Sequence, residues 1–90
     1  MSFLEPKHNC RICIRLNDYL KVQRDKFPKW HNGPVKGIGS IKSKFLIVGL
    51  APGLKGANKT GIPFSGDFSG DFIIKSLKKY NFIKKNEDFN

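Results

Sequence analysis

Two groups of residues in this sequence have the types and spacing to carry chemistry. The first is the Cys-x-x-Cys pair of Cys10 and Cys13, which is typical of half a metal site, of a redox pair, or of two buried thiols. Zinc sites and iron–sulfur clusters need four ligands, so a metal role requires two further ligands. No other cysteine is present, and His8 and His31 are poorly spaced for a zinc finger. The metal, redox and structural hypotheses all stay open, including a zinc protein that dimerises to complete a four-cysteine site.

The second group lies in residues 49–72, which contain six glycines, two prolines and three phenylalanines. Backbone amides in a glycine-rich turn between a strand and a helix can bind an anion. The glycine spacing matches neither the nucleotide P-loop nor the dinucleotide fingerprint. Pro63 and Phe64 place an aromatic ring on a stiffened stretch, and Asp67 adds a carboxylate. A ring beside an acid, with lysines nearby, favours a planar ligand on a phosphate backbone, such as a flipped nucleobase.

Each of these side chains also has an ordinary structural explanation. An isolated Phe64 is typical of a core residue, and an isolated Asp67 is typical of the charge found at a helix start. The order and combination of the residues therefore carry the functional hypothesis, not any one of them.

The charge balance predicts an anionic partner. The 90 residues, enough for one domain at most, carry 17 Lys and Arg against 7 Asp and Glu, a net charge of +10. Nucleic acid is the first expectation and an anionic membrane surface the second, while a generally lysine-rich proteome is the alternative explanation. No apolar run approaches the ~18 residues of a membrane span, and no signal-peptide pattern is present. We therefore expect a cytoplasmic protein with reduced thiols and no membrane partner.

The elements that must position these groups follow from the apolar pattern. Residues 10–27 have the pattern of an amphipathic helix with a basic outer face, which Asn9 could cap and Pro28 would end. An irregular stretch follows, in which we expect Trp30 to anchor the loop by packing. The continuous apolar run at residues 45–48 predicts a strand buried on both faces, as in a parallel sheet. A second helix is predicted from Ser69 to residue 80.

This order of elements predicts an α/β domain with a ligand site at the carboxyl end of its first strand. A sheet needs about three strands or a covering helix to be stable, and the pattern supplies one strand. We therefore expect residues 1–90 to be the front part of a longer protein. The alternative is a self-contained miniature domain.

The residue order in segment 49–72 resembles the first active-site motif of the uracil-DNA glycosylase superfamily, most closely its family 5, the B-type enzymes. Members look like Gly-Leu-Ala-Pro, then Asn-Arg-Thr-Gly-Arg, then Phe-Thr-Gly-Asp and Ser-Gly-Asp. This sequence keeps the first and last of these groups and most of the others. It departs at Lys59, which keeps the charge of the usual Arg but not its bidentate geometry, and at Ile62, where a second Arg is common. Upstream, "CRICIRL" and "GPVKGIGS" are also similar to the family, so the match covers roughly residues 9–82.

The resemblance implies a fold and a cofactor. The fold is a three-layer α/β/α sandwich with a parallel sheet, of which residues 1–90 would form the N-terminal portion of a single domain. Residues 10–27 would be its helix near the cofactor, residues 45–72 its first strand and active-site motif, and residues 69–80 its next helix. The cofactor is a four-iron four-sulfur cluster, with Cys10 and Cys13 as two of its four ligands and the others beyond Asn90.

The resemblance also implies hydrolysis of the N-glycosidic bond of uracil, and of other deaminated bases as a further option, in DNA repair by base excision. Asp67 would take the polar catalytic role, because Leu50 and Ala51 replace the superfamily's usual acid or amide, as in the B-type enzymes. The remaining residues expected at the site bind the base or the DNA: Ala51, Pro52, Gly53, Asn58 and Phe64 the base, and Lys55 and Lys59 the DNA.

The family's second catalytic motif, which carries a histidine, is missing from these residues. We therefore expect this chain to be inactive alone and the complete enzyme to be a monomer that acts on uracil-containing DNA. The alternative is a small basic nucleic-acid-binding module without catalysis, whose lysines contact phosphates while Trp30 or Phe64 stacks on a base.

Overall fold

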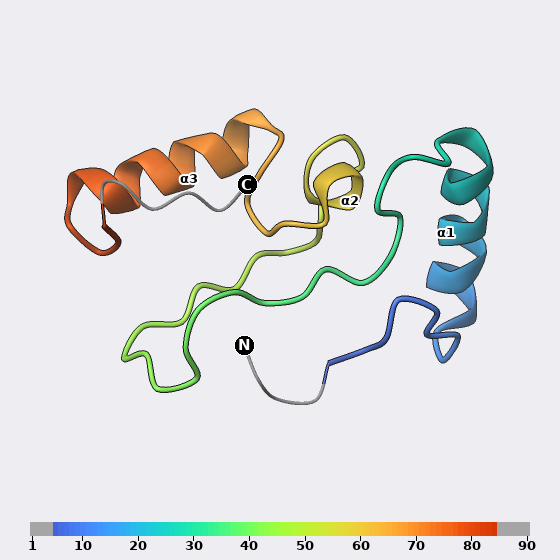
Figure 1. The fold of residues 1–90 in the computed structure, drawn as a ribbon, viewed down its shortest axis with the longest axis horizontal. Coiled ribbons are helices and arrows are strands. Elements are labelled where there is room, and N and C mark those ends of the chain that lie inside the picture. Colours follow the sequence, from blue (N-terminus) through green and yellow to red (C-terminus); the bar gives the residue numbers. More distant parts are fainter. Residues whose placement is uncertain (1–4, 85–90) are drawn as a thin grey trace.

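The computed structural model describes residues 5–84, and its regular elements in that range are three helices: α1 (Ile14–Lys26), α2 (Ala57–Thr60) and α3 (Phe68–Lys79). Helices α1 and α3 lie at opposite ends of the molecule, with the single turn of α2 between them (Figure 1). No two of these helices pack on each other. Loops therefore position the glycine-rich segment relative to the helices.

Helix α1 begins later than the sequence pattern predicts. The chain forms a turn before it, closed by a hydrogen bond from the Cys10 N–H to the Lys7 carbonyl at 3.0 Å. Asn9 lies in this turn, so the prediction that it caps the helix is wrong. The N-cap residue is Cys13, with extended backbone and no capping hydrogen bond from its side chain. The helix ends at Lys26, directly before Phe27 and Pro28, as predicted.

Helix α3 begins one residue before the predicted Ser69 because Asp67 caps it. The Asp67 Oδ1 atom accepts a hydrogen bond from the Gly70 backbone N–H at 2.9 Å. A Cβ on Gly70 would lie 2.5 Å from the Phe64 carbonyl oxygen, so the missing side chain lets the first turn of α3 press against the backbone of Phe64. The cap and this close approach fix the start of α3 against the loop that precedes it.

The apolar run at residues 45–48 is not a strand in the described part of the chain. Its side chains are exposed, with Val48 showing 80% of its surface and Leu46 70%. A strand exists through hydrogen bonds to a neighbouring strand, and residues 5–84 supply no such neighbour. The parallel sheet stays a prediction.

Polar groups dominate the buried part of the described chain. Ala57 is the single buried apolar residue in this range, whereas the buried polar residues are Gln23, Asn32, Asn58 and Ser65. Among the described residues, every buried side-chain nitrogen and oxygen has a hydrogen-bond partner. The interior around α2 is thus held mainly by hydrogen bonds.

The loop after α1 is anchored by aromatic packing, as predicted. The Trp30 ring stacks on the Phe27 ring with the centroids 3.8 Å apart and the planes within 5° of parallel.

Within residues 5–84, no helix combines the length and apolarity that a bilayer span requires.

Candidate functional site

The glycine-rich segment forms one side of a concavity of about 530 Å³. Its lining comes from the stretch 47–53, from Ala57 of α2, from the loop 63–65 and from the start of α3, with Val35 contributing from an earlier loop. Small-molecule sites fall in a range of roughly 300–1,000 Å³, so the concavity is large enough for a single nucleotide base and part of its sugar.

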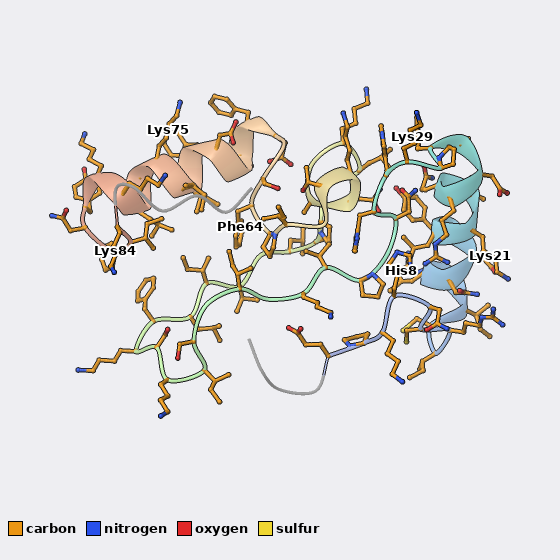
Figure 2. All side chains as sticks on the ribbon, viewed as in Figure 1. His8, Lys21, Lys29, Phe64, Lys75 and Lys84 are labelled. Carbon is orange, nitrogen blue, oxygen red and sulfur yellow. The ribbon has the colours of Figure 1, made fainter. Side chains whose placement is uncertain are left out.

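Phe64 lies in the lining of this pocket, half-buried, between α2 and α3 (Figure 2). Its ring lies over Gly49, where an added Cβ would come within 3.2 Å of the ring edge. Its backbone has a φ of +56°, in the left-handed region that bulky residues rarely adopt. Such a conformation costs on the order of 1–3 kcal/mol and persists only where the surroundings impose it. Here the packing of Gly70 against the Phe64 carbonyl is part of that constraint.

The loop that carries Phe64 is closed by two hydroxyl groups. The Thr60 and Ser65 hydroxyls are hydrogen-bonded to each other at 2.6 Å. The Ser65 hydroxyl also donates to the Ile62 carbonyl at 2.7 Å. These bonds join the end of α2 to the residue after Phe64, so they fix the stretch that holds the aromatic ring.

Asp67 brings a carboxylate to the same pocket. Its Oδ1 atom caps α3, and its Oδ2 atom lies against the turn 53–56. A Cβ on Gly53 would be 2.7 Å from Oδ2, and a Cβ on Gly56 would collide with the same carboxylate. A side chain at either position would have to displace the carboxylate, which occupies the space where that side chain would start. The structure thus brings Phe64 and Asp67 together with the predicted backbone stretch 51–53.

Three further residues predicted for the site lie outside the pocket lining. Lys55 and Lys59 are exposed on the outer side of the segment, and the Lys59 Nζ lies 5.4 Å from the centroid of the Trp30 ring. Asn58 is buried in α2 behind the wall, and its side-chain amide donates to the Asn32 Oδ1 at 3.0 Å and to the Leu54 carbonyl at 3.2 Å.

Sequence reasoning missed two contributors to this region. The first is the helical turn α2, which is too short to produce a periodic apolar pattern. The second is Asn32, which is 1% exposed and has a φ of +48°. The Asn32-Gly33 dipeptide is a signal for a left-handed backbone and could have drawn attention to it.

The two cysteines lie just before α1, Cys10 in the preceding turn and Cys13 at the N-cap. Cys10 is half-buried and Cys13 is exposed, and neither is in a disulfide. Soft thiolates at one accessible turn are suitable ligands for an iron–sulfur cluster or for zinc. The described residues contribute no group of three or more potential metal ligands, so this pair supplies half of a four-ligand set at most.

Comparison with known proteins identifies the family. The model of the family described as "Uracil DNA glycosylase superfamily" matches residues 36–88. The type-5 uracil-DNA glycosylase of Mycobacterium leprae is 43% identical over 81 residues, which cover 82% of this chain and 35% of that protein. The Thermus thermophilus type-5 uracil-DNA glycosylase is 36% identical over an alignment of 92 positions, which covers 96% of this chain and 42% of the relative.

A third relative, the type-5 uracil-DNA glycosylase of Pyrobaculum aerophilum, is 34% identical over 80 residues, which cover 84% of this chain and 35% of its own length. The chain therefore spans roughly a third to two fifths of the relatives it matches. No solved structure gives a significant match. Because the family model matches more than half of the sequence, the chain belongs to the uracil DNA glycosylase superfamily, whose fold is of the α/β class.

Proposed function

We propose that this chain forms the base-binding part of a DNA-repair glycosylase that hydrolyses the N-glycosidic bond of uracil. One observation carries the proposal: an aromatic ring and a carboxylate, Phe64 and Asp67, line one concavity in a chain of the uracil DNA glycosylase superfamily. The relatives are named for uracil-DNA glycosylase activity, which supports uracil as the base.

Phe64 is the proposed stacking platform for a flipped base. Extruding a base from a duplex costs a few kcal/mol, and stacking on an aromatic ring returns about 1–3 kcal/mol per base. The ring is held by its unusual backbone conformation and by contact with Gly49, so little conformational freedom remains to be lost when a base binds. The main chain of Ala51, Pro52 and Gly53 forms the adjoining wall, where we place the edge of the base.

Asp67 is the proposed catalytic residue. As the glycosidic bond breaks, positive charge develops on the sugar and negative charge on the departing base. The Asp67 Oδ1 is fixed by Gly70, while Oδ2 is placed at the turn 53–56. We propose that this carboxylate accepts a hydrogen bond from the attacking water and holds it toward the sugar. Asp67 is the single ionisable side chain in the pocket lining formed by the described residues, which supports this assignment.

Lysines outside the pocket are the proposed contacts to DNA phosphates. Lys55 and Lys59 are exposed next to the turn that forms the pocket wall. Other lysines, including Lys21, Lys29 and Lys75, lie at the periphery of the molecule (Figure 2). With the net charge of +10, these side chains favour binding to a polyanion and predict affinity that falls with salt.

Cys10 and Cys13 are the proposed ligands to two corners of a four-iron four-sulfur cluster. When bound, such a cluster would cross-link the start of α1 to the segments that supply its other thiolates. Metal analysis of the purified complete protein tests this: iron with inorganic sulfide supports it, and zinc without iron contradicts it. Replacing Cys13 with Ser should remove the iron signal.

We further propose that residues 45–48 form a strand of a parallel sheet within a three-layer α/β/α sandwich. Successive apolar side chains in this run are exposed in the described chain, including those of Phe45, Leu46 and Val48. This exposure supports a strand whose two faces are covered by other segments of the protein. In this arrangement the 90 residues provide base binding but not the whole catalytic machinery, and the complete enzyme acts as a monomer.

The test compares binding with base release. The 90-residue chain is titrated into fluorescent single-stranded oligonucleotides that carry either one uracil or one thymine at the same position, and free uracil is measured by mass spectrometry. We expect tighter binding to the uracil strand and no uracil release. Release by this chain would overturn its proposed incompleteness. Equal affinity for both strands would overturn the base pocket and favour the non-catalytic binding module, which the net charge and the exposed lysines otherwise support.

A further inference from the structure

Asn32 is the most completely buried large side chain in the described chain, and its polar groups are hydrogen-bonded to three separate segments. Its Nδ2 group donates to the Phe27 carbonyl at 2.7 Å and to the Trp30 carbonyl at 3.3 Å. Its Oδ1 accepts from the Asn58 side chain at 3.0 Å, and its backbone N–H donates to the Asn58 carbonyl at 2.9 Å. Asn32 therefore joins the end of α1, the loop after it and the helical turn α2.

Helix α2 depends on such outside support. It has four residues, and an isolated helical turn is unstable because its nucleation cost is not repaid by propagation. Ala57 of this turn lines the base pocket, and Gly56 just before it contacts the Asp67 carboxylate. Two backbone bonds, from His31 to Lys59 and from Asn32 to Asn58, run from the loop to α2. The position of the pocket wall is thus set from the side opposite the ligand.

The same cluster reaches the segment before α1. Arg24 donates from Nε to the Asn32 carbonyl at 2.9 Å and from a terminal nitrogen to the His8 carbonyl at 2.9 Å. The His8 ring donates to the His31 carbonyl at 2.7 Å. Figure 2 shows His8 beside α1. The bonds of Arg24 and His8 hold the loop against α1, so Asn32 is fixed on one side by α1 while it holds α2 on the other.

We propose that Asn32 is a positioning residue that acts through Asn58 to hold the wall of the base pocket in place. Asn32 is not among the residues that line the pocket. Its role is to keep α2, and with it Ala57 and Gly56, at the distance from Phe64 and Asp67 that a base requires. The inference depends on the proposed function only for the identity of the ligand, because the link between Asn32 and α2 can be measured without DNA.

The test uses Asn32→Gly in the protein, with Asn81→Gly as a matched control. Both asparagines have positive φ, so glycine keeps the backbone conformation at both sites, but Asn81 is exposed at the end of α3. Amide hydrogen exchange is followed at Lys59, Thr60 and Gly61, whose N–H groups bond within or beside α2, with the amides of α3 as an internal reference. We expect at least tenfold faster exchange in α2 for Asn32→Gly, and changes below twofold in α3 and throughout Asn81→Gly.

The second measurement is the ratio of affinities for the uracil and thymine oligonucleotides. We expect Asn32→Gly to lower this ratio at least fivefold while affinity for the thymine strand stays within twofold, a split that general destabilisation would not produce. Unchanged exchange, exchange that rises equally in α2 and α3, or an unchanged ratio would each overturn the proposal. If Asn32→Gly loses its helical circular dichroism, Asn58→Ser tests the same bond from the other side, with the same expected results.

Failure of the proposed function gives a different pattern. If the wild-type protein itself does not distinguish uracil from thymine, the base pocket assignment fails. The exchange measurement then decides alone whether Asn32 positions α2.

Discussion

Replacing Asp67 separates its structural role from its proposed catalytic role. Its Oδ1 accepts from Gly70 at 2.9 Å, a distance typical of a good hydrogen bond, and the side chain is half-buried. An N-cap of this kind contributes about 1 kcal/mol, within a range of roughly 0.5–2 kcal/mol. For a domain of this size, a loss of about 1 kcal/mol lowers the unfolding midpoint by roughly 4–8 °C. We expect that drop for Asp67→Ala.

Asp67→Asn keeps an oxygen that can accept from Gly70 and removes the negative charge, so it provides the matched control. Asn and Asp cap helices about equally well, and the midpoint should stay within about 2 °C of the wild type. If the carboxylate orients the attacking water, uracil release by the complete glycosylase should fall about 10²- to 10⁴-fold in Asp67→Asn, as for a lost acid–base group.

The assays are thermal circular dichroism for α3 and single-turnover uracil release for catalysis. Wild-type release by Asp67→Asn would refute the catalytic role. An unchanged midpoint for Asp67→Ala would refute the cap as a stabilising contact.

Three further predictions concern the pocket and its rim. Gly56→Ala should lower the free energy of unfolding by about 1–3 kcal/mol in denaturant titrations. The added Cβ would collide with the Asp67 carboxylate and lie 3.1 Å from the Ser65 carbonyl oxygen. A change below about 0.5 kcal/mol would contradict this prediction. Phe64→Gly should be more stable than Phe64→Ala by about 0.5–1 kcal/mol, because a φ of +56° costs alanine about 1–2 kcal/mol and the entropy cost of glycine offsets about 0.5–1 kcal/mol of this. Both variants should lose about 1–3 kcal/mol of binding to the uracil strand. A more stable alanine variant would argue against backbone strain. Lys59→Gln and Lys55→Gln should each reduce the salt dependence of DNA binding by about one phosphate contact. Lys59→Gln should also lower the free energy of unfolding by up to about 0.5–1 kcal/mol, because the Lys59 ammonium lies over the Trp30 ring. Equal unfolding free energies for the wild type and Lys59→Gln would show that this contact contributes nothing.

Local signals in the sequence predicted part of the fold well. The end of α1 before Pro28, the packing of Trp30 and the start of α3 within one residue all depend on nearby residues. The start of α1 was predicted wrongly because the helical pattern continues into a turn that a backbone hydrogen bond closes between Lys7 and Cys10. The strand at residues 45–48 stays a prediction, because a strand forms only against neighbouring strands and the described residues contain none.

The placement of the candidate site residues was likewise predicted only in part. Phe64, Asp67 and the stretch 51–53 were identified from residue order, and the structure places them around one concavity. Asn58 was expected at the base, yet its amide is bound inside the molecule to Asn32, a residue that lies far from it in the sequence. Residue type and spacing reveal which groups can do chemistry, but they do not reveal which way a polar side chain turns.

The sequence by itself determined the family, the positive charge and the set of groups proposed to hold a base, because these depend on residue identity and order along the chain. The tertiary structure decided the backbone conformation of Phe64, the placement of the Asp67 carboxylate against Gly53 and Gly56, and the burial of Asn32 between α1 and α2. These features arise from contacts between segments that are separated in sequence, where close packing and the need to satisfy buried hydrogen bonds select one arrangement among many that local preferences allow.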